Sequence, residues 1–168
     1  MSGAAPKTNV LRLLASRGIP HQAYSFSGDV HSAEGAAEAM GVPASHVYKT
    51  LVVLRERGRP LLVLVPGGRQ LDLRRLARAV GEKKLRMATQ REAEALTGLQ
   101  VGGISALALL NRGFQVYVDS SALQLGEFYV SAGQRGLDVR LPVADLMRLT
   151  GARAVEAIEL DTNGTSVV

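Results

Sequence analysis

The sequence predicts a single α+β domain in which helices pack on a mixed, mostly antiparallel sheet. Its 168 residues are enough to bury one hydrophobic core and too few for two typical domains. The apolar, β-branched runs come in pairs joined by short turns, as in β-hairpins. Helical segments lie among them without the regular strand and helix alternation that builds a parallel sheet, so a doubly wound fold is only the alternative. We expect the domain to fill residues 1–168, with a frayed tail at about 161–168.

The composition is that of an ordinary globular protein, with 46% hydrophobic and 21% charged residues. Because the chain has no cysteine, a disulfide framework, a thiolate nucleophile and a cysteine-based metal site are all excluded. No secretory segment is visible, and no apolar run approaches the ~20 residues of a membrane helix. We therefore expect a cytoplasmic protein. The net charge of +5 and the excess of arginine over lysine suit an acidic partner such as RNA.

The central element is a predicted hairpin formed by residues 47–54 and 61–65, two apolar runs separated by the charged turn 55–59. Side chains alternate across a strand, so Lys49 shares a face with apolar residues such as Leu51. Its ammonium therefore either reaches water from the end of the strand or is held in a pocket. The alternation pattern leaves both interpretations open.

Helix starts and stops are marked by N-cap side chains and by glycines. The predicted helices lie between Thr8 and Gly18, Ser32 and Gly41, Asp72 and Gly81, Thr89 and Gly98, and Pro142 and Gly151. Apolar runs bounded by turn residues predict the other strands. These are His21–Phe26, Phe114–Asp119, Glu127–Ser131, Leu137–Leu141 and the edge strand Val155–Leu160, and the loop Ala132–Gly136 is expected to join the third and fourth.

Three polar clusters are candidates for chemistry. The first is Tyr48–Thr50, which contains Lys49. The second is Gly102–Ser105, whose glycines allow a close approach to a ligand and N–H donation to an oxyanion or phosphate, but which could equally be a plain turn. The third is Ser131–Asp138, which on its own could be a set of hairpin residues. A Ser131 nucleophile with Lys49 as its base would make a hydrolase. The three histidines show no metal-ligand spacing, and no metal or cofactor is expected.

A basic surface is predicted on the helix after Asp72. Arg74, Arg75 and Arg78 fall on the side opposite its apolar residues, and Lys83 and Lys84 follow the helix. Such a face is either simply solvated or binds phosphates of a nucleic acid.

Four separated motifs occur in one order and at spacings that closely resemble the YbaK/EbsC family of aminoacyl-tRNA deacylases, over about residues 8–158. The motifs are Val47-Tyr-Lys-Thr-Leu-Val-Val53, Gln70-Leu-Asp-Leu73, Thr97-Gly98 with Val101-Gly-Gly-Ile-Ser105, and Tyr129-Val-Ser-Ala-Gly-Gln-Arg-Gly-Leu-Asp138. The resemblance implies an α+β domain related to the editing insertion of bacterial prolyl-tRNA synthetase. It also implies hydrolysis of the ester of a mischarged tRNA in trans.

The resemblance is strongest to the branch that acts on Cys-tRNA(Pro), so the implied partners are mischarged tRNA-Pro and, as a candidate, prolyl-tRNA synthetase, with no membrane. Site residues are carried over by motif. The family's essential lysine corresponds to Lys49, with Tyr48 and Thr50 beside it, the glycine-rich substrate loop to Gly102, Gly103 and Ser105, the serine and aspartate of the last motif to Ser131 and Asp138, and a pocket tyrosine to Tyr24. The basic surface, Arg74, Arg75, Arg78, Lys83 and Lys84, is the expected contact for the tRNA.

The mechanism implied for Cys-tRNA is attack by the substrate's own thiol, which gives a cyclic thiolactone. On this view Lys49 positions the terminal phosphate or ribose, and the Gly103 N–H faces the oxyanion. One departure concerns substrate choice, because Ala106-Leu107-Ala108 replaces the usual Pro, apolar residue and Gly. The alternatives are a deacylase for another ester such as Ala-tRNA(Pro) that uses water, a non-catalytic module that binds tRNA or a synthetase, and a Ser131 hydrolase of small esters.

Overall fold

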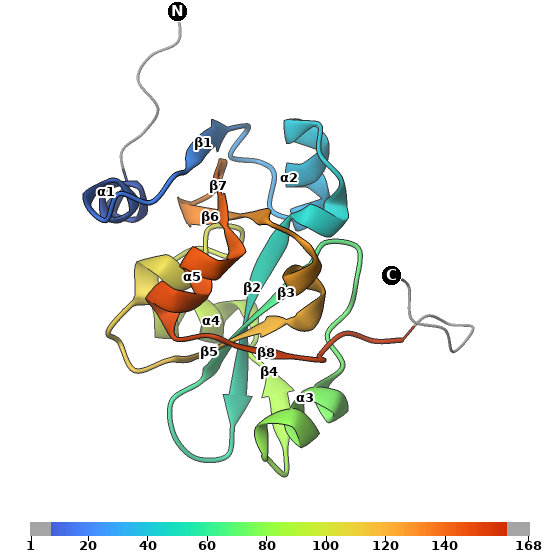
Figure 1. The fold of residues 1–168 in the computed structure, drawn as a ribbon. Coiled ribbons are helices and arrows are strands. Elements are labelled where there is room, and N and C mark those ends of the chain that lie inside the picture. Colours follow the sequence, from blue (N-terminus) through green and yellow to red (C-terminus); the bar gives the residue numbers. More distant parts are fainter. Residues whose placement is uncertain (1–7, 161–168) are drawn as a thin grey trace, which may run out of the picture.

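The computed structural model describes residues 8–160, which form one α+β domain with two β-sheets. Its α-helices are α1 (Asn9–Ser16), α2 (Ala33–Met40), α3 (Leu73–Val80), α4 (Gln90–Thr97) and α5 (Val143–Thr150), and its 3₁₀ turns are η1 (Ala44–His46), η2 (Ala106–Leu109) and η3 (Ser120–Gln124). Its strands are β1 (Gln22–Ser25), β2 (Tyr48–Arg55), β3 (Leu61–Pro66), β4 (Leu85–Met87), β5 (Gln115–Asp119), β6 (Glu127–Gln134), β7 (Leu137–Pro142) and β8 (Arg153–Val155). Figure 1 shows this order along the chain.

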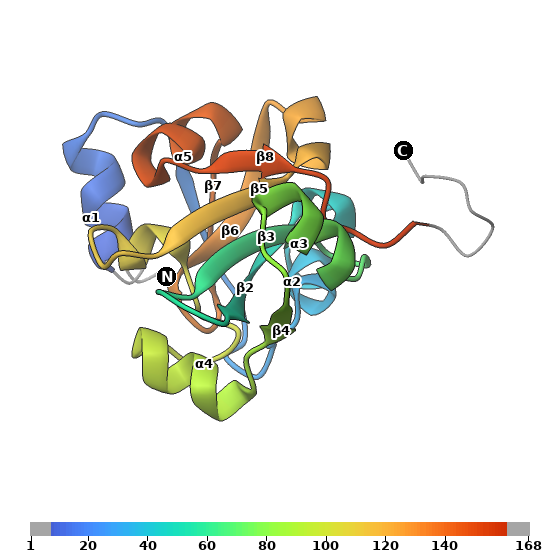
Figure 2. The same cartoon turned by 90° about the horizontal axis from the view of Figure 1, so that it is seen from below.

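The larger sheet has the strand order β4-β2-β3-β5-β8, and α3 lies in front of it in Figure 2. The predicted central hairpin is confirmed, because β2 and β3 pair antiparallel with Tyr48 opposite Pro66 and Val53 opposite Leu61. The β3–β5 and β5–β8 pairs are parallel, which makes the sheet mixed. Every residue of β3 is buried, and burial on both faces explains why this strand reads as an uninterrupted apolar run.

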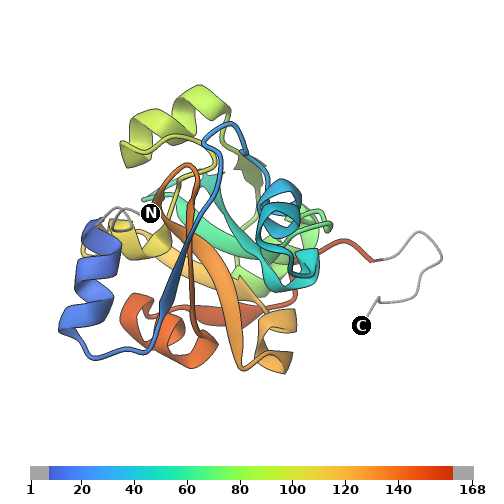
Figure 3. The same cartoon turned by 90° about the horizontal axis from the view of Figure 1, so that it is seen from above.

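The smaller sheet is antiparallel and has the order β1-β7-β6. An isolated parallel bridge between Val47 and Tyr129 joins it to the beginning of β2. Figure 3 shows α1 and α2 on opposite sides of this small sheet. The bridge therefore brings β6 and the outer face of the small sheet next to the segment that contains Lys49.

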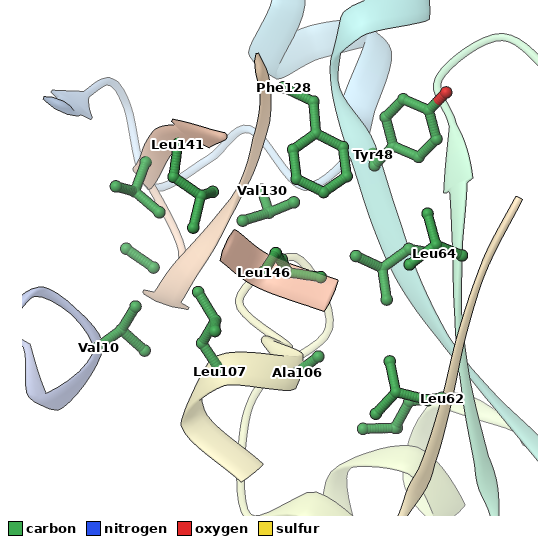
Figure 4. Close-up of a cluster of buried hydrophobic side chains, with 14 of the residues drawn as sticks. Val10, Tyr48, Leu62, Leu64, Ala106, Leu107, Phe128, Val130, Leu141 and Leu146 are labelled. Carbon is green, nitrogen blue, oxygen red and sulfur yellow. The ribbon is translucent and has the colours of Figure 1, made fainter. Parts of the chain in front are cut away.

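The main core fills the space between the two sheets. Figure 4 shows Phe128 and Val130 of β6 facing Leu62 and Leu64 of β3, with Leu146 of α5 beside them. A second cluster lies between the large sheet and α3, and a third lies between α2 and the outer face of the small sheet. The alternation predicted for β2 is confirmed, since its odd-numbered and even-numbered residues belong to different clusters.

The cap residues predicted from the sequence are confirmed for the first four helices, including the reciprocal capping box of Thr89 and Glu92. The prediction that Ala132–Gly136 forms a five-residue loop is wrong. Strand β6 continues to Gln134 through a bulge, and only two residues turn the chain into β7. Strand β4 was not predicted, and the last edge strand is Arg153–Val155. No helix within residues 8–160 has the length and apolar character needed to cross a membrane.

Candidate functional site

A cavity of about 310 Å³ opens beside the first half of β2. Its walls come from the start of α2, the β4–α4 junction, the loop before η2, and strands β6 and β7. The cavity lies where β2 lacks a paired strand, because β4 pairs only with Val53–Arg55 and β6 meets the beginning of β2 only through the isolated Val47–Tyr129 bridge. Six of the predicted site residues line it, namely Tyr48, Lys49, Thr50, Gly102, Ser131 and Asp138.

The free edge of β2 presents backbone groups to this cavity. The Val52 carbonyl accepts a hydrogen bond from the Ala88 N–H at 3.0 Å, so Val52 faces the β4 side. Residues two apart on a strand direct their amide and carbonyl groups to the same side, and Thr50 therefore faces the open edge. Thr50 is half-buried and lines the cavity. It offers both a donor and an acceptor to a bound molecule.

Lys49 is half-buried on the opposite face of β2, with the fully buried Val65 as its cross-strand neighbour. Lys49 lines the cavity, and its side chain makes no hydrogen bond or ion pair with any residue in the range 8–160. The ammonium therefore has its donors available to a ligand. Between the two interpretations that the sequence left open, this arrangement favours a lysine held at a pocket.

Ser131 and Asp138 are cross-strand neighbours on β6 and β7, and Tyr24 is the neighbour of Asp138 on β1. The Ser131 hydroxyl accepts a hydrogen bond from the Gly133 N–H at 3.1 Å, across the bulge of β6. Tyr24 does not line the cavity, and its ring packs edge-on against Tyr129 with centroids 5.5 Å apart. Of these three predicted residues, the structure brings Ser131 and Asp138 to the cavity, whereas Tyr24 supports the wall behind them.

Asp138 is a buried carboxyl group, with only 6% of its surface exposed. Burial disfavours its charged form and raises its pKa from the ordinary value of 3.8 to about 6. Among residues 8–160, none donates a hydrogen bond to the carboxyl oxygens. An acidic group kept in this state is costly for folding and is typical of a functional position.

The Tyr48 side chain does not have the substrate-binding role predicted for it. Its ring lies in the main core against Phe128, and its hydroxyl is hydrogen-bonded to the Ser121 hydroxyl at 2.6 Å. Burial raises the pKa of this phenol to about 12. Tyr48 therefore anchors the start of β2 in the core, because a tyrosine has enough reach to satisfy its polar end there.

Both glycines allow close packing, and the structure corrects the role predicted for Gly103. Gly102 lines the cavity with a φ of +95°, and a Cβ there would lie 3.2 Å from the His31 Cα. The Gly103 N–H donates to the Gln100 carbonyl at 2.8 Å and is not free to face an oxyanion. A Cβ on Gly103 would lie 2.8 Å from the Arg135 backbone nitrogen. Gly103 is thus required where the loop presses on the β6–β7 turn.

Ser105 is also placed away from the predicted substrate contact. It is 1% exposed, and its hydroxyl accepts a hydrogen bond from the Leu107 N–H at 3.2 Å as the cap of η2. The unusual segment Ala106-Leu107-Ala108 forms this 3₁₀ turn and packs in or against the main core. None of its residues lines the cavity. The departure from the family motif therefore lies at the core and not in the cavity lining.

The predicted basic surface lies on α3, near the end of β2 opposite to α2 (Figure 1). Arg74 and Arg78 are exposed, as are Lys83 and Lys84. Arg75 differs, because its guanidinium donates to the Ile158 carbonyl at 2.8 Å and pairs with Glu156 at 3.1 Å. It ties α3 to the segment after β8 and is not a free phosphate contact. None of these residues lines the cavity.

Two parts of the wall were not predicted as site residues. His31–Glu34, at the start of α2, and Met87–Gln90, at the start of α4, both line the cavity. The sequence signal was present in the N-caps Ser32 and Thr89, which mark where each helix begins. The two helix starts lie together at the free edge of β2 only in the tertiary structure, so the sequence did not reveal this part of the wall.

The buried carboxyl gives a pH-dependent stability prediction. Because the pKa of Asp138 is raised on folding, the folded chain holds this proton more tightly, and stability falls as pH rises from about 4 to about 6. The full penalty, up to about 3 kcal/mol, persists above that range. We expect Asp138→Asn to gain stability relative to wild type at pH 8 but not at pH 4, which denaturant unfolding at both pH values measures. Asp29→Asn, at an exposed aspartate that forms no ion pair within residues 8–160, is the control. A difference that does not vary with pH would contradict this account.

Comparison with known proteins identifies the family. Residues 27–149 match the aminoacyl-tRNA editing domain family. A relative from Enterococcus faecalis, described as "Putative Cys-tRNA(Pro)/Cys-tRNA(Cys) deacylase EbsC", is 35% identical over 89% of this chain and 92% of its own length. A proline–tRNA ligase from Desulfovibrio desulfuricans is 30% identical over 78% of this chain, which spans only 22% of that larger protein.

Two crystal structures share the fold. One, described as a "putative trans-editing enzyme for prolyl tRNA synthetase", has a TM-score of 0.78 and 30% identity, with 92% of this chain and 99% of the other covered. The other, hypothetical protein APE2540, has a TM-score of 0.81 and 27% identity, with 89% and 99% covered. The match spans most of the described domain in sequence and in structure. The chain belongs to the YbaK/EbsC family of aminoacyl-tRNA editing domains.

Proposed function

We propose that this protein is a trans-editing enzyme that removes cysteine from mischarged tRNA-Pro. The observation that carries the proposal is the cavity at the free edge of β2, where the unpaired Lys49 and the buried Asp138 lie together in an editing domain. The relative from E. faecalis, which this chain matches over nearly its full length, is described as a putative deacylase of Cys-tRNA(Pro) and Cys-tRNA(Cys). The direct test is release of amino acid from Cys-tRNA(Pro), Ala-tRNA(Pro) and Pro-tRNA(Pro) by purified protein. Cleavage of the first alone supports the proposal.

Lys49 positions the end of the tRNA in this proposal. An ammonium with no protein partner suits a terminal phosphate or ribose oxygen, and a correctly held ester lowers the barrier to an intramolecular attack. The backbone N–H and carbonyl of the neighbouring Thr50 lie on the open edge of β2. With the Gly103 N–H occupied, the Thr50 N–H and the Gly102 backbone, which both border the cavity, are the candidates to stabilise the developing oxyanion.

The nucleophile in this proposal is the thiol of the esterified cysteine. The chain itself has no cysteine, and the Ser131 hydroxyl has no histidine or lysine within hydrogen-bonding distance among residues 8–160. A serine without a neighbouring base is a weak nucleophile. A substrate thiol, with a pKa of roughly 8.5, is much more easily activated.

The lysine prediction uses two variants, Lys49→Ala and the near-isosteric Lys49→Met. We expect both to reduce kcat/KM for Cys-tRNA(Pro) by about 10²-fold or more, in the range typical of losing one positioned donor. The fold should remain, because the ammonium has no partner whose loss would leave a buried group unsatisfied. Turnover and melting temperature are measured together, with the exposed Arg153→Ala as control. Wild-type turnover in Lys49→Met would show that the positive charge of Lys49 is not needed for deacylation.

The nucleophile prediction compares Cys-tRNA(Pro) with Ser-tRNA(Pro), which differ in one atom. Shape alone discriminates between such close substrates by only ~10 to 200-fold. Thiol attack should exceed that ratio, and Ser131→Ala should keep much of its activity, because one positioning hydrogen bond is worth ~0.5 to 1.5 kcal/mol. Single-turnover rates for both esters give the ratio. Equal rates together with no activity in Ser131→Ala would instead identify Ser131 as the nucleophile.

The tRNA surface prediction uses the double variant Arg74→Glu/Arg78→Glu. We expect weaker tRNA affinity and a smaller slope of log K against log salt, by about 0.7 to 0.9 for each phosphate that the variant no longer neutralises. The control Arg17→Glu/Arg153→Glu has the same change in net charge at two exposed positions, the C-cap of α1 and the start of β8. Binding titrations from low to moderate salt measure both slopes. Identical slopes in the two variants would show that α3 is only solvated.

A further inference from the structure

At neutral pH the substrate thiol is mostly protonated, so its attack is accelerated by a group that takes its proton. We propose that the Asp138 carboxylate is this proton acceptor and later returns the proton to the departing ribose oxygen. This inference rests on the proposed deacylase function and assigns to Asp138 a catalytic role beyond substrate binding.

The two buried aspartates of the described residues differ in a way that separates structure from function. Asp119 is 2% exposed and accepts hydrogen bonds from the Ser121 N–H at 3.0 Å and the Ala157 N–H at 2.9 Å. Asp138 is buried to a similar degree but receives no hydrogen bond from residues 8–160. A carboxyl that only stabilised the fold would have such donors. Asp138 instead lines a cavity that a substrate can enter.

The position of Asp138 on its strand explains this orientation. Its neighbours Leu137 and Val139 point into the main core, so Asp138 points to the opposite face of β7. That face carries Ser131 on β6 and Tyr24 on β1 as direct cross-strand neighbours. Ser131 also lines the cavity and leaves room beside the carboxyl, because its side chain is short.

No charged group among residues 8–160 neutralises Asp138. Lys49 on β2, together with His31 and Glu34 at the start of α2, shares the cavity, and none of them lies within ion-pair distance of it. Arg140, two residues along β7, is directed to Gln22 and Glu127. Tyr24 and Tyr129 pack against each other. Burial therefore raises the pKa of Asp138 to about 6. At neutral pH the group is still a carboxylate, but it is a stronger base than an exposed aspartate.

The reaction balances without any further reactant until the thiolactone is released. The carboxylate takes the thiol proton as sulfur bonds to the ester carbonyl carbon. The bond between that carbon and the ribose oxygen then breaks, and the ribose oxygen takes the proton from the carboxylic acid. The products are uncharged tRNA and a cyclic thiolactone, and Asp138 is again a carboxylate. Water subsequently opens the thiolactone to cysteine.

A different role for the same carboxylate is charge pairing with the α-ammonium of the substrate. The two roles are separated by 3-mercaptopropionyl-tRNA(Pro), which keeps the thiol and the ester and lacks the α-amino group. A proton acceptor is needed equally for both substrates. An ammonium partner is needed only for Cys-tRNA(Pro).

The experiment measures single-turnover rates at saturating protein for wild type, Asp138→Asn and the control Asp145→Asn, between pH 5 and pH 9, with both substrates. We expect the wild-type and control rates to rise with pH and level off just above pH 6. Asp138→Asn should be at least 10²-fold slower at pH 7 on both substrates. Its rate should keep rising toward pH ~8.5, where the thiol ionises without help.

Each other outcome overturns a defined statement. If Asp138→Asn levels off at the same pH as wild type, Asp138 is not the proton acceptor, although the deacylase function stands. If its defect disappears with 3-mercaptopropionyl-tRNA(Pro), the carboxylate binds the α-ammonium and the inference fails. If wild type cleaves neither substrate at any pH, the proposed function itself fails, and the inference fails with it.

Discussion

The incomplete pairing of β2 is the constraint on which the rest of the site depends. β2 pairs with β3 along most of its length, whereas its other strand contacts are the three residues of β4 and the isolated bridge from Val47 to Tyr129 of β6. Backbone groups on an open strand edge have to be satisfied by water, by other protein or by a ligand. In this domain the starts of α2 and α4 lie beside the open edge, and the cavity lies between them and β2. The candidate site residues Lys49, Ser131 and Asp138 lie on the strands that border this cavity.

The arrangement combines a well-satisfied scaffold with an unsatisfied site. The hydroxyl of Tyr48, the carboxyl of Asp119 and the guanidinium of Arg75 each have partners that hold one element to another. Lys49 and Asp138 have none among the described residues, and both reach the cavity. The burial of an unpaired carboxyl at Asp138 destabilises the fold, and the three hydrophobic clusters offset this. That contrast, more than any single distance, is why we propose functional roles for Lys49 and Asp138.

The glycine-rich loop shows how one motif can have a structural explanation. Val101 is held on both sides, because its N–H donates to Glu94 at 2.8 Å and its carbonyl accepts from Arg135 at 2.7 Å. Gly102 and Gly103 then pass close to His31 and to the β6–β7 turn, where side chains would collide. The loop is therefore a rigid wall of the cavity, and rigidity is what a site needs to position an ester.

The sequence by itself determined the α+β class, the capped helices, the central hairpin and the family. These follow from local signals, such as the reciprocal caps at Thr89 and Glu92, and from motifs whose residues are close in the chain. It also named Lys49 and Asp138, but it could not say that Tyr48 and Ser105 face the core or that Gly103 has no free N–H. It missed β4, which is only three residues long, and the convergence of two helix starts on one strand edge. Only the tertiary structure decided those points, because side-chain partners and open edges depend on contacts between segments far apart in the chain.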